Sequence, residues 1–263
     1  MIPPILLLGL GKMGSAMVSG WQERGLSPSF AVDPSRPGSP GPAMTVVGDV
    51  AEIPANFRPQ AVVLAVKPQV AGQILAVAAR HPHAVMLSIM AGKTIRVLQQ
   101  GCGETAAIVR AMPNTPAAIR QGITVACAGA HVSQSQRELC HALLESVGLV
   151  EWVDDETLID PVTAVSGGGP AYVFLLAELL EQAAIEQGIP ADLARKMARQ
   201  TVSGSGALLA ASAEDAAQLR RNVTSPQGTT ERALAVLMDA DAWPRAVSKA
   251  IAAATARSRE LAG

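Results

Sequence analysis

An apolar segment that leads directly into a glycine motif constrains this chain more than any other feature. The run Ile5–Leu8 is uninterrupted, as in a parallel strand buried on both faces, and the apolar positions after the motif have helical spacing. A strand, a glycine turn and a helix in this order place helix N-terminal amides against a pyrophosphate. A turn that merely packs a helix closely on a strand is the alternative. The candidate dinucleotide contacts are Gly9, Gly11, Lys12, Met13 and Gly14.

Strand-like and helix-like segments alternate through the first part of the chain. The expected strands are residues 5–8, 30–32, 61–66, 84–89, 107–110, 122–126 and 149–153. This alternation predicts a Rossmann-type, doubly wound parallel sheet with right-handed crossovers. Strand signals stop after Asp154, and helical patterns follow. We therefore expect a dinucleotide-binding α/β domain at residues 1–154 and an all-α domain at residues 155–263.

Charge and cysteine content exclude several classes of protein. The 21 Lys and Arg nearly balance the 22 Asp and Glu, and no run of basic residues is longer than a pair such as Arg220-Arg221, which disfavours a nucleic-acid binder. Cys102, Cys127 and Cys140 are far apart, and the four histidines do not cluster with carboxylates, so no disulfide framework or metal site is expected. The apolar run at residues 2–10 is too short to span a membrane. These features favour a cytoplasmic protein with reduced thiols.

Two opposed signals for the cofactor follow the second expected strand. Asp33 lies near the distance at which a Rossmann acid binds the ribose hydroxyls of NAD. Ser35 and Arg36 come next, and a guanidinium there suits the 2′-phosphate of NADP. The segment 34–42 is rich in Pro, Gly and Ser, so a plain solvated loop also explains it.

The carboxyl ends of two further strands are expected to line the cofactor crevice, because open α/β sheets bind ligands at that edge. One end carries Val66, Lys67 and Pro68. The other leads into a loop with Met112, Pro113 and Asn114, which Pro113 and Pro116 are expected to hold extended. A rigid turn in which Asn114 only binds backbone is the alternative.

A turn interrupts the helical half at residues 222–231. Ser225-Pro226 ends one helix, and Thr229 or Thr230 is expected to cap the next. A helix N-terminus carries unpaired amides, so it can bind a carboxylate without a basic side chain. An ordinary turn between helices is the alternative.

Strings of residues along most of the chain resemble the pyrroline-5-carboxylate reductase family. They are AVKPQ at 65–69, RAMPNTPA at 110–117, SGGGPAY at 166–172 and LRRNVTSPQGTTERALAVLMD at 219–239. The resemblance implies hydride transfer from NAD(P)H to the C=N carbon of 1-pyrroline-5-carboxylate, which gives L-proline, the last step of proline biosynthesis. One alternative is another NAD(P)-dependent dehydrogenase of the same architecture that acts on a related cyclic imine or on a hydroxyacid. A hydroxyacid enzyme of this kind would need a lysine early in the helical half, and none lies between Lys93 and Lys196. The other alternative is a non-catalytic dinucleotide-sensing protein, which would not need the apparent substrate-binding turn at residues 225–230.

The resemblance also implies roles for single residues. The turn begins at Ser225, and its backbone amides at Gly228 and Thr229 would bind the substrate carboxylate. Thr230 would hydrogen-bond the ring nitrogen. Residues 112–114 would contact the nicotinamide, and NADPH would be favoured over NADH. The chain departs from the family pattern at two positions. Gln227 and Gly168 replace a usual Gly and a usual Ser.

The helical half also predicts self-association. The expected helix from Tyr172 to residue 187 is apolar around most of its circumference, and Gly204 and Gly206 permit close helix contact. A monomer would expose a large apolar patch, so we expect a homodimer through these helices. The resemblance adds a ring of dimers, a decamer.

Overall fold

The computed structural model describes residues 1–35, 38 and 40–262, without the side chains of Pro68 and Gln73. The chain forms two compact units. The first contains Met1–Gly167 together with the C-terminal segment from Ala254, and the second contains Gly168–Ala253.

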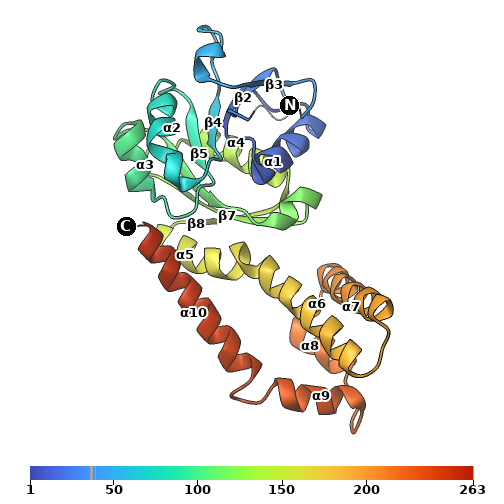
Figure 1. Ribbon diagram of the computed structural model, residues 1–263. Coiled ribbons are helices and arrows are strands. Elements are labelled where there is room, and N and C mark those ends of the chain that lie inside the picture. The colour runs from blue at the N-terminus through green and yellow to red at the C-terminus, as the bar shows by residue number, and fades with distance from the viewer. Residues whose placement is uncertain (36–37, 39, 263) are drawn as a thin grey trace. The chain divides into compact units, whose positions relative to one another are not determined.

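The first unit is built on one eight-stranded sheet in the order β3-β2-β1-β4-β5-β6-β7-β8 (Figure 1). Its strands are β1 Ile5–Leu8, β2 Ser29–Val32, β3 Met44–Val47, β4 Ala61–Leu64, β5 Val85–Ser88, β6 Ile108–Met112, β7 Gly122–Ala128 and β8 Gly148–Val153. Its helices include α1 Lys12–Glu23, α2 Ala71–Ala78, α3 Ile95–Cys102, α4 Gln134–Glu145 and α5 Ile159–Val162. The sequence order reverses between β1 and β4. The predicted doubly wound Rossmann-type architecture is therefore confirmed.

Two details of the sheet differ from the sequence-based expectation. Strand β3 was not expected, although Met44-Thr45-Val46-Val47 is a short apolar run next to a Pro-Gly-rich loop. Strand β7 is antiparallel to β6, with Met112 opposite Val125, whereas the other pairs are parallel. The physical reason is the connection, which is short and contains only a 3₁₀ turn. A parallel neighbour needs a longer crossover.

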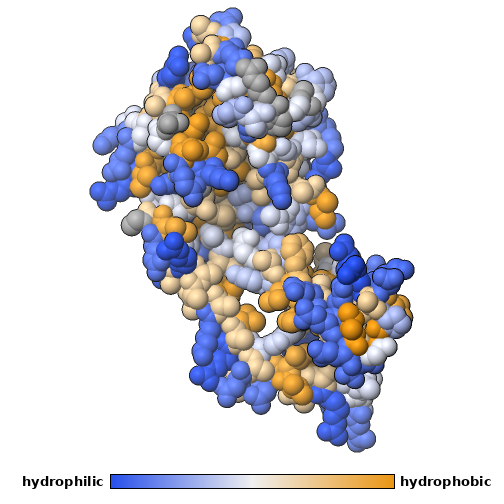
Figure 2. Space-filling model, in the orientation of Figure 1, coloured by the Kyte–Doolittle hydropathy of each residue, from blue (hydrophilic) through white to orange (hydrophobic). Residues whose placement is uncertain are grey.

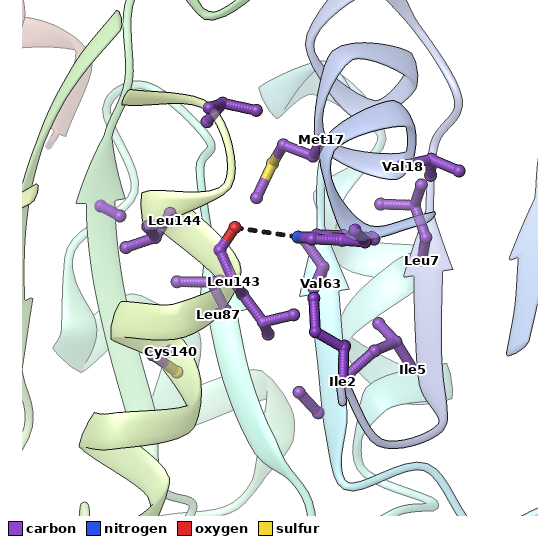
Figure 3. Close-up of a cluster of buried hydrophobic side chains, with 14 of the residues drawn as sticks. Ile2, Ile5, Leu7, Met17, Val18, Val63, Leu87, Cys140, Leu143 and Leu144 are labelled. Atoms are coloured by element: carbon purple, nitrogen blue, oxygen red, sulfur yellow. Dashed lines mark hydrogen bonds between the residues drawn. The ribbon is translucent and has the colours of Figure 1, made fainter. Parts of the chain in front are cut away.

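Alternate residues of each strand supply two separate cores on the two faces of the sheet. In β1, Ile5 and Leu7 join the core under α1 and α4, and Leu6 and Leu8 join the core under α2 and α3. On the first face, the indole Nε1 of Trp21 donates a 2.9 Å hydrogen bond to the Leu143 carbonyl of α4 (Figure 3). Burial of each large apolar side chain contributes about 1.5 to 3 kcal/mol. These contacts fix the helices against the sheet and so position the glycine turn.

The first unit extends past the boundary expected at residue 154. Ile159 of α5 is fully buried and belongs to the core on the α2 and α3 face of the sheet. A π-helical turn, Thr163–Gly167, completes the unit, and the next residue starts the second one. Burial of α5 against the sheet explains why the compact unit ends at Gly167.

The second unit is entirely helical. It contains α6 Gly169–Glu186, α7 Ala191–Ala211, α8 Ala216–Asn222, α9 Thr229–Leu237 and the first part of α10 Trp243–Ala262, whose last turns belong to the first unit. Helix α6 starts with Pro170 in its first turn, as predicted. None of its residues is buried in the single chain, and Phe174 is 67% exposed. Figure 2 shows apolar side chains on the surface of this unit.

One helical stretch, Glu156–Glu186, is long and apolar enough by length and composition to cross a membrane. Only 6% of its most apolar window is buried in the single chain. A helix that packs against another subunit meets the same criterion, so the exposure by itself identifies only an uncovered apolar surface.

Candidate functional site

The three glycines of the first turn have different structural roles. Gly9 has φ +99°, and a Cβ there would lie 2.8 Å from the Ala65 carbonyl oxygen at the end of β4. A Cβ at Gly14 would lie 2.5 Å from the Gly9 carbonyl oxygen, so only glycine lets α1 approach the turn. A Cβ at Gly11 meets nothing within 4 Å among the described atoms. Gly9 and Gly14 shape the turn, and Gly11 keeps the space beside it open.

The open space at Gly11 coincides with the N-terminus of α1. Gly11 is its N-cap residue, no described side chain caps it, and its first turn carries no acidic residue. The first amides of a helix have no acceptor within the helix. An anion placed here would therefore meet free N–H groups and the positive end of the helix dipole. These features fit the pyrophosphate of a dinucleotide, with exposed Lys12 and half-buried Met13 at the same end.

Asp33 is tied to the glycine turn. Its Oδ2 accepts the Leu10 N–H at 2.9 Å, and its Oδ1 accepts the Ser35 hydroxyl at 2.6 Å and the Ser35 N–H at 2.9 Å. Burial alone would raise the pKa of Asp33, but these hydrogen bonds outweigh it and lower the pKa below its ordinary value. Asp33 is thus a charged acceptor that holds the turn. Arg36, the other candidate in this loop, lies outside the described residues.

The residues after β4 lie against the glycine turn. A Cβ at Gly9 would lie 2.8 Å from the carbonyl oxygen of Ala65 and 2.9 Å from Cγ1 of Val66. Lys67 is exposed and precedes a short 3₁₀ turn, Pro68–Val70. The ends of β1, β2 and β4 therefore meet at one edge of the sheet, as expected for Gly9, Asp33 and Val66.

The segment after β6 is only partly as predicted. Met112 belongs to the strand and is buried, and Pro113 after it is buried as well. Asn114 is extended, but Thr115–Ile119 forms a 3₁₀ helix, so the prediction that the prolines hold the whole loop extended is wrong. Pro116 occupies the first turn of that helix, where its missing N–H costs nothing.

The Asn114 side chain binds backbone on two sides. Its Oδ1 accepts the Ile123 N–H of β7 at 3.0 Å, and its Nδ2 donates to the Ser166 carbonyl at 3.2 Å. The structure thus favours the alternative that Asn114 organises backbone. Its side chain joins β7 to the π-helical turn, and that arrangement fixes the path of the chain at the end of β6.

Arg110 is a functional candidate that the sequence motifs do not single out. Its side chain is 2% exposed in β6, and Nη1 donates to Glu156 Oε1 at 2.9 Å, while Nη2 lies 3.6 Å from Asp160 Oδ1. Glu156 also accepts the Ile95 N–H that opens α3, and Asp160 accepts the Ser258 hydroxyl of α10 at 2.8 Å. A charged residue within an apolar strand was the signal available in the sequence.

The Arg110 cluster joins four segments within the first unit. Burying these charges is costly unless they are paired, so the pairing holds α5 and the end of α10 to the sheet. Nε and Nη2 of Arg110 have no hydrogen-bond partner among the described atoms. Because Arg110 lies two residues before Met112, the cluster also fixes the strand end where the nicotinamide contacts are expected.

The predicted substrate turn lies in the second unit. The Gly228 N–H donates to the Ser225 carbonyl at 3.0 Å, which closes a turn with Pro226 and Gln227 in the middle. A Cβ at Gly228 would lie 2.9 Å from that carbonyl oxygen, so glycine is required by close approach. Gln227 has φ +59°, which favours glycine and explains why the departure at this position matters.

Helix α9 starts at Thr229, and its N-cap is Gly228 rather than Thr229 or Thr230. Among the residues that the structure describes, no side chain caps this helix, so the capping prediction is wrong. The reason is that the turn at residues 225–228 leads directly into the helix, so both threonines lie in the first turn of α9. Both threonines are exposed in the single chain at a helix end that no described side chain caps, which is the arrangement that an anion-binding helix end requires.

Comparisons with known proteins extend over nearly the whole chain. A family model described as pyrroline-5-carboxylate reductase dimerisation matches residues 156–261. The pyrroline-5-carboxylate reductase of Pseudomonas aeruginosa is 39% identical over an alignment of 269 positions, gaps included, which covers 99% of this chain and 97% of that protein. The Haemophilus influenzae enzyme is 33% identical, with coverages of 98% and 97%.

Solved structures give the same result. A pyrroline-5-carboxylate reductase from Coxiella burnetii has a TM-score of 0.89 at 31% identity and covers 98% of both chains. The Plasmodium falciparum enzyme, solved with NADP bound, has a TM-score of 0.85 at 28% identity, with coverages of 99% and 98%. Prephenate dehydrogenase from Aquifex aeolicus reaches only 0.53 at 16% identity and shares the fold alone.

The sheet, the glycine turn and the helical second unit define a Rossmann-type nicotinamide-dinucleotide oxidoreductase. Its relatives place it more narrowly. The chain belongs to the pyrroline-5-carboxylate reductase family.

Proposed function

We propose that this protein reduces 1-pyrroline-5-carboxylate to L-proline with a nicotinamide dinucleotide. The observation that carries the proposal is the uncapped N-terminus of α9, because it offers amide donors to a substrate carboxylate in the segment that the family shares. The bound dinucleotide would supply hydride to the C=N carbon. The direct test is an assay of the purified protein with pyrroline-5-carboxylate and NADPH. Turnover of a hydroxyacid instead, or cofactor binding without turnover, would contradict it.

The chain's own contribution is mainly positioning. A protonated imine accepts hydride readily, so orientation of the two reactants accounts for most of the rate. The Gly228 amide is already bonded within the turn, which leaves the amides of Thr229 and Thr230 for the substrate carboxylate. The Thr230 hydroxyl would hydrogen-bond the ring nitrogen, and Ser225 and Gly228 would hold the turn in shape.

We propose NADPH as the preferred cofactor and NADH as a weaker alternative. The hydrogen bonds of Asp33 support this preference. Leu10 and Ser35 already donate to its two carboxylate oxygens, so they compete with a ribose hydroxyl of NADH for the same acceptors. Ser35 and Arg36 are the proposed ligands of the 2′-phosphate, and the Ser35 hydroxyl would turn from Asp33 Oδ1 to the phosphate when the cofactor binds. Arg36→Ala should raise KM for NADPH and leave KM for NADH unchanged. Equal effects on both cofactors would remove Arg36 from phosphate recognition.

We propose a homodimer through the helical second unit, assembled further into a ring of dimers. Support comes from the match to the family's dimerisation region and from α6, which has no buried residue in the single chain. Gly206 of α7 also faces open space, since a Cβ there meets nothing within 4 Å among the described atoms. A second copy that covers these surfaces, rather than a membrane, accounts for the apolar exposure. Native mass spectrometry would distinguish a dimer from a decamer.

We propose a cytoplasmic location. The three cysteines are free thiols, and burial raises the pKa of Cys102 to about 11, which favours its unreactive protonated form. Free, buried thiols are typical of a reducing compartment. Fractionation with an antibody against the native protein would test the location, and recovery in a secreted or membrane fraction would contradict it.

A further inference from the structure

The turn before α9 contains a backbone conformation that its sequence does not favour. The Gly228 N–H bonded to Ser225 makes Pro226 and Gln227 the two central residues. Proline suits the first central position, but a positive φ at the second normally calls for Gly or Asn. Gln227 adopts φ +59° nevertheless. Some other contact must stabilise this conformation.

That contact is made by Glu231. Its Oε2 accepts the Gln227 N–H at 2.8 Å, a hydrogen bond from the strained residue to the third residue of α9. A carboxylate acceptor makes the bond stronger than a neutral one would. The carboxylate also lies in the first turn of α9, where the helix dipole favours negative charge.

We infer that Glu231 is a positioning residue, which holds Gln227 in the left-handed conformation and thereby keeps the α9 amides in place for the substrate carboxylate. The inference rests on the proposed function, because the turn affects catalysis only if it binds this substrate. Glu231 has no role in the chemical step. Its loss should therefore change KM for the imine and leave kcat nearly unchanged.

The steady-state test uses four variants. Glu231→Ala should raise KM for pyrroline-5-carboxylate about three- to tenfold, with kcat within about twofold. Glu231→Gln keeps an acceptor oxygen and should stay within about twofold of the wild type. Gln227→Gly should be nearly neutral, and Glu231→Ala in that background should raise KM by less than about twofold, because glycine needs no such support.

The matched control is Glu260→Ala, which removes another exposed carboxylate, one that pairs with Arg257 within α10. It should leave KM and kcat unchanged. An equal rise of KM from Glu231→Ala in both backgrounds would overturn the inference, as would a Glu231→Ala variant with wild-type KM.

Amide hydrogen exchange tests the same contact without turnover. The Gln227 amide should exchange about tenfold faster in Glu231→Ala than in the wild type or in Glu260→Ala. Unchanged exchange would overturn the inference even if KM rises. A wild-type protein that does not reduce the imine would instead overturn the proposed function, and with it any role of Glu231 in that reaction.

Discussion

The Leu10 N–H donates a 2.9 Å hydrogen bond to Asp33 Oδ2 across 23 residues of sequence. This bond joins the glycine turn after β1 to the end of β2. It makes Asp33 a structural part of the cofactor site as well as a candidate ribose ligand.

Replacement of Asp33 should separate these two roles. Asp33→Ala frees the Leu10 amide and should raise KM for NADPH and NADH alike, by about tenfold. Asp33→Asn keeps an acceptor for Leu10 and removes the charge, so it should favour NADPH relative to NADH. Steady-state kinetics with both cofactors measures the ratio. A fall in NADPH preference in Asp33→Asn would contradict this assignment.

The stability effect of Asp33→Ala should also depend on pH. The pKa of Asp33 is lowered in the folded protein, from an ordinary value of 3.8. A carboxyl of this kind adds stability above its unfolded pKa and loses that contribution as the pH falls through the folded value. The stability difference between wild type and variant should thus be constant from about pH 6 to 8 and shrink below about pH 4. Urea denaturation at each pH would measure it.

Gly11→Ala should mainly weaken cofactor binding, whereas Gly14→Ala should mainly lower Tm. A Cβ at Gly11 is in open space, so Gly11→Ala should lower Tm only slightly, through the poorer N-cap residue, and weaken NADPH binding at least about tenfold, by filling the space for the pyrophosphate. Gly14→Ala would gain about 1 kcal/mol in helix propensity. It should nevertheless lower Tm, because its Cβ collides with the Gly9 carbonyl. Thermal melts and fluorescence titrations would show both effects.

Thr230→Ala should lower kcat/KM about ten- to hundredfold, because a lost hydrogen bond to a partly charged group costs about 1.5 to 3 kcal/mol. The exposed Thr105, in the loop after α3, provides a matched Thr→Ala control that should have wild-type kinetics. Unchanged kinetics in a well-folded Thr230→Ala variant would remove Thr230 from the site.

Arg110→Leu should lower the free energy of unfolding by about 3 kcal/mol or more, because it leaves Glu156 and Asp160 without their buried partner. Arg257→Leu removes an exposed pair in α10 and should cost less than about 1 kcal/mol. Chemical denaturation at one fixed protein concentration compares them, since assembly also contributes to stability. Similar losses in the two variants would show that the buried cluster is not special.

Phe174→Arg should dissociate the assembly without unfolding the chain, because this side chain is 67% exposed in the single subunit. Light scattering should give at least twice the chain mass of 27.1 kDa for the wild type and the single mass for the variant. Circular dichroism checks that the helices remain. A wild-type protein that is monomeric and fully active would contradict the proposed dimer.

The sequence by itself determined the local elements and the family. Apolar runs, the glycine spacing and the alternation of strands and helices predicted the Rossmann-type unit, because each depends on residues close together in the chain. The string at 219–239 predicted the turn and the helix after it. The unexpected strand β3 is a similar local feature, since its apolar run is visible between residues 44 and 47.

Only the tertiary structure decided the rest. The sequence of a short apolar strand does not indicate its direction in the sheet. The antiparallel pairing of β7 with β6 follows from the short connection between them. Arg110 is buried because Glu156 lies 46 residues further along the chain and meets it in space. The support of Gln227 by Glu231 likewise depends on how the turn closes. These contacts depend on distance in space and on backbone conformation, and neither is encoded in the periodicity of the sequence.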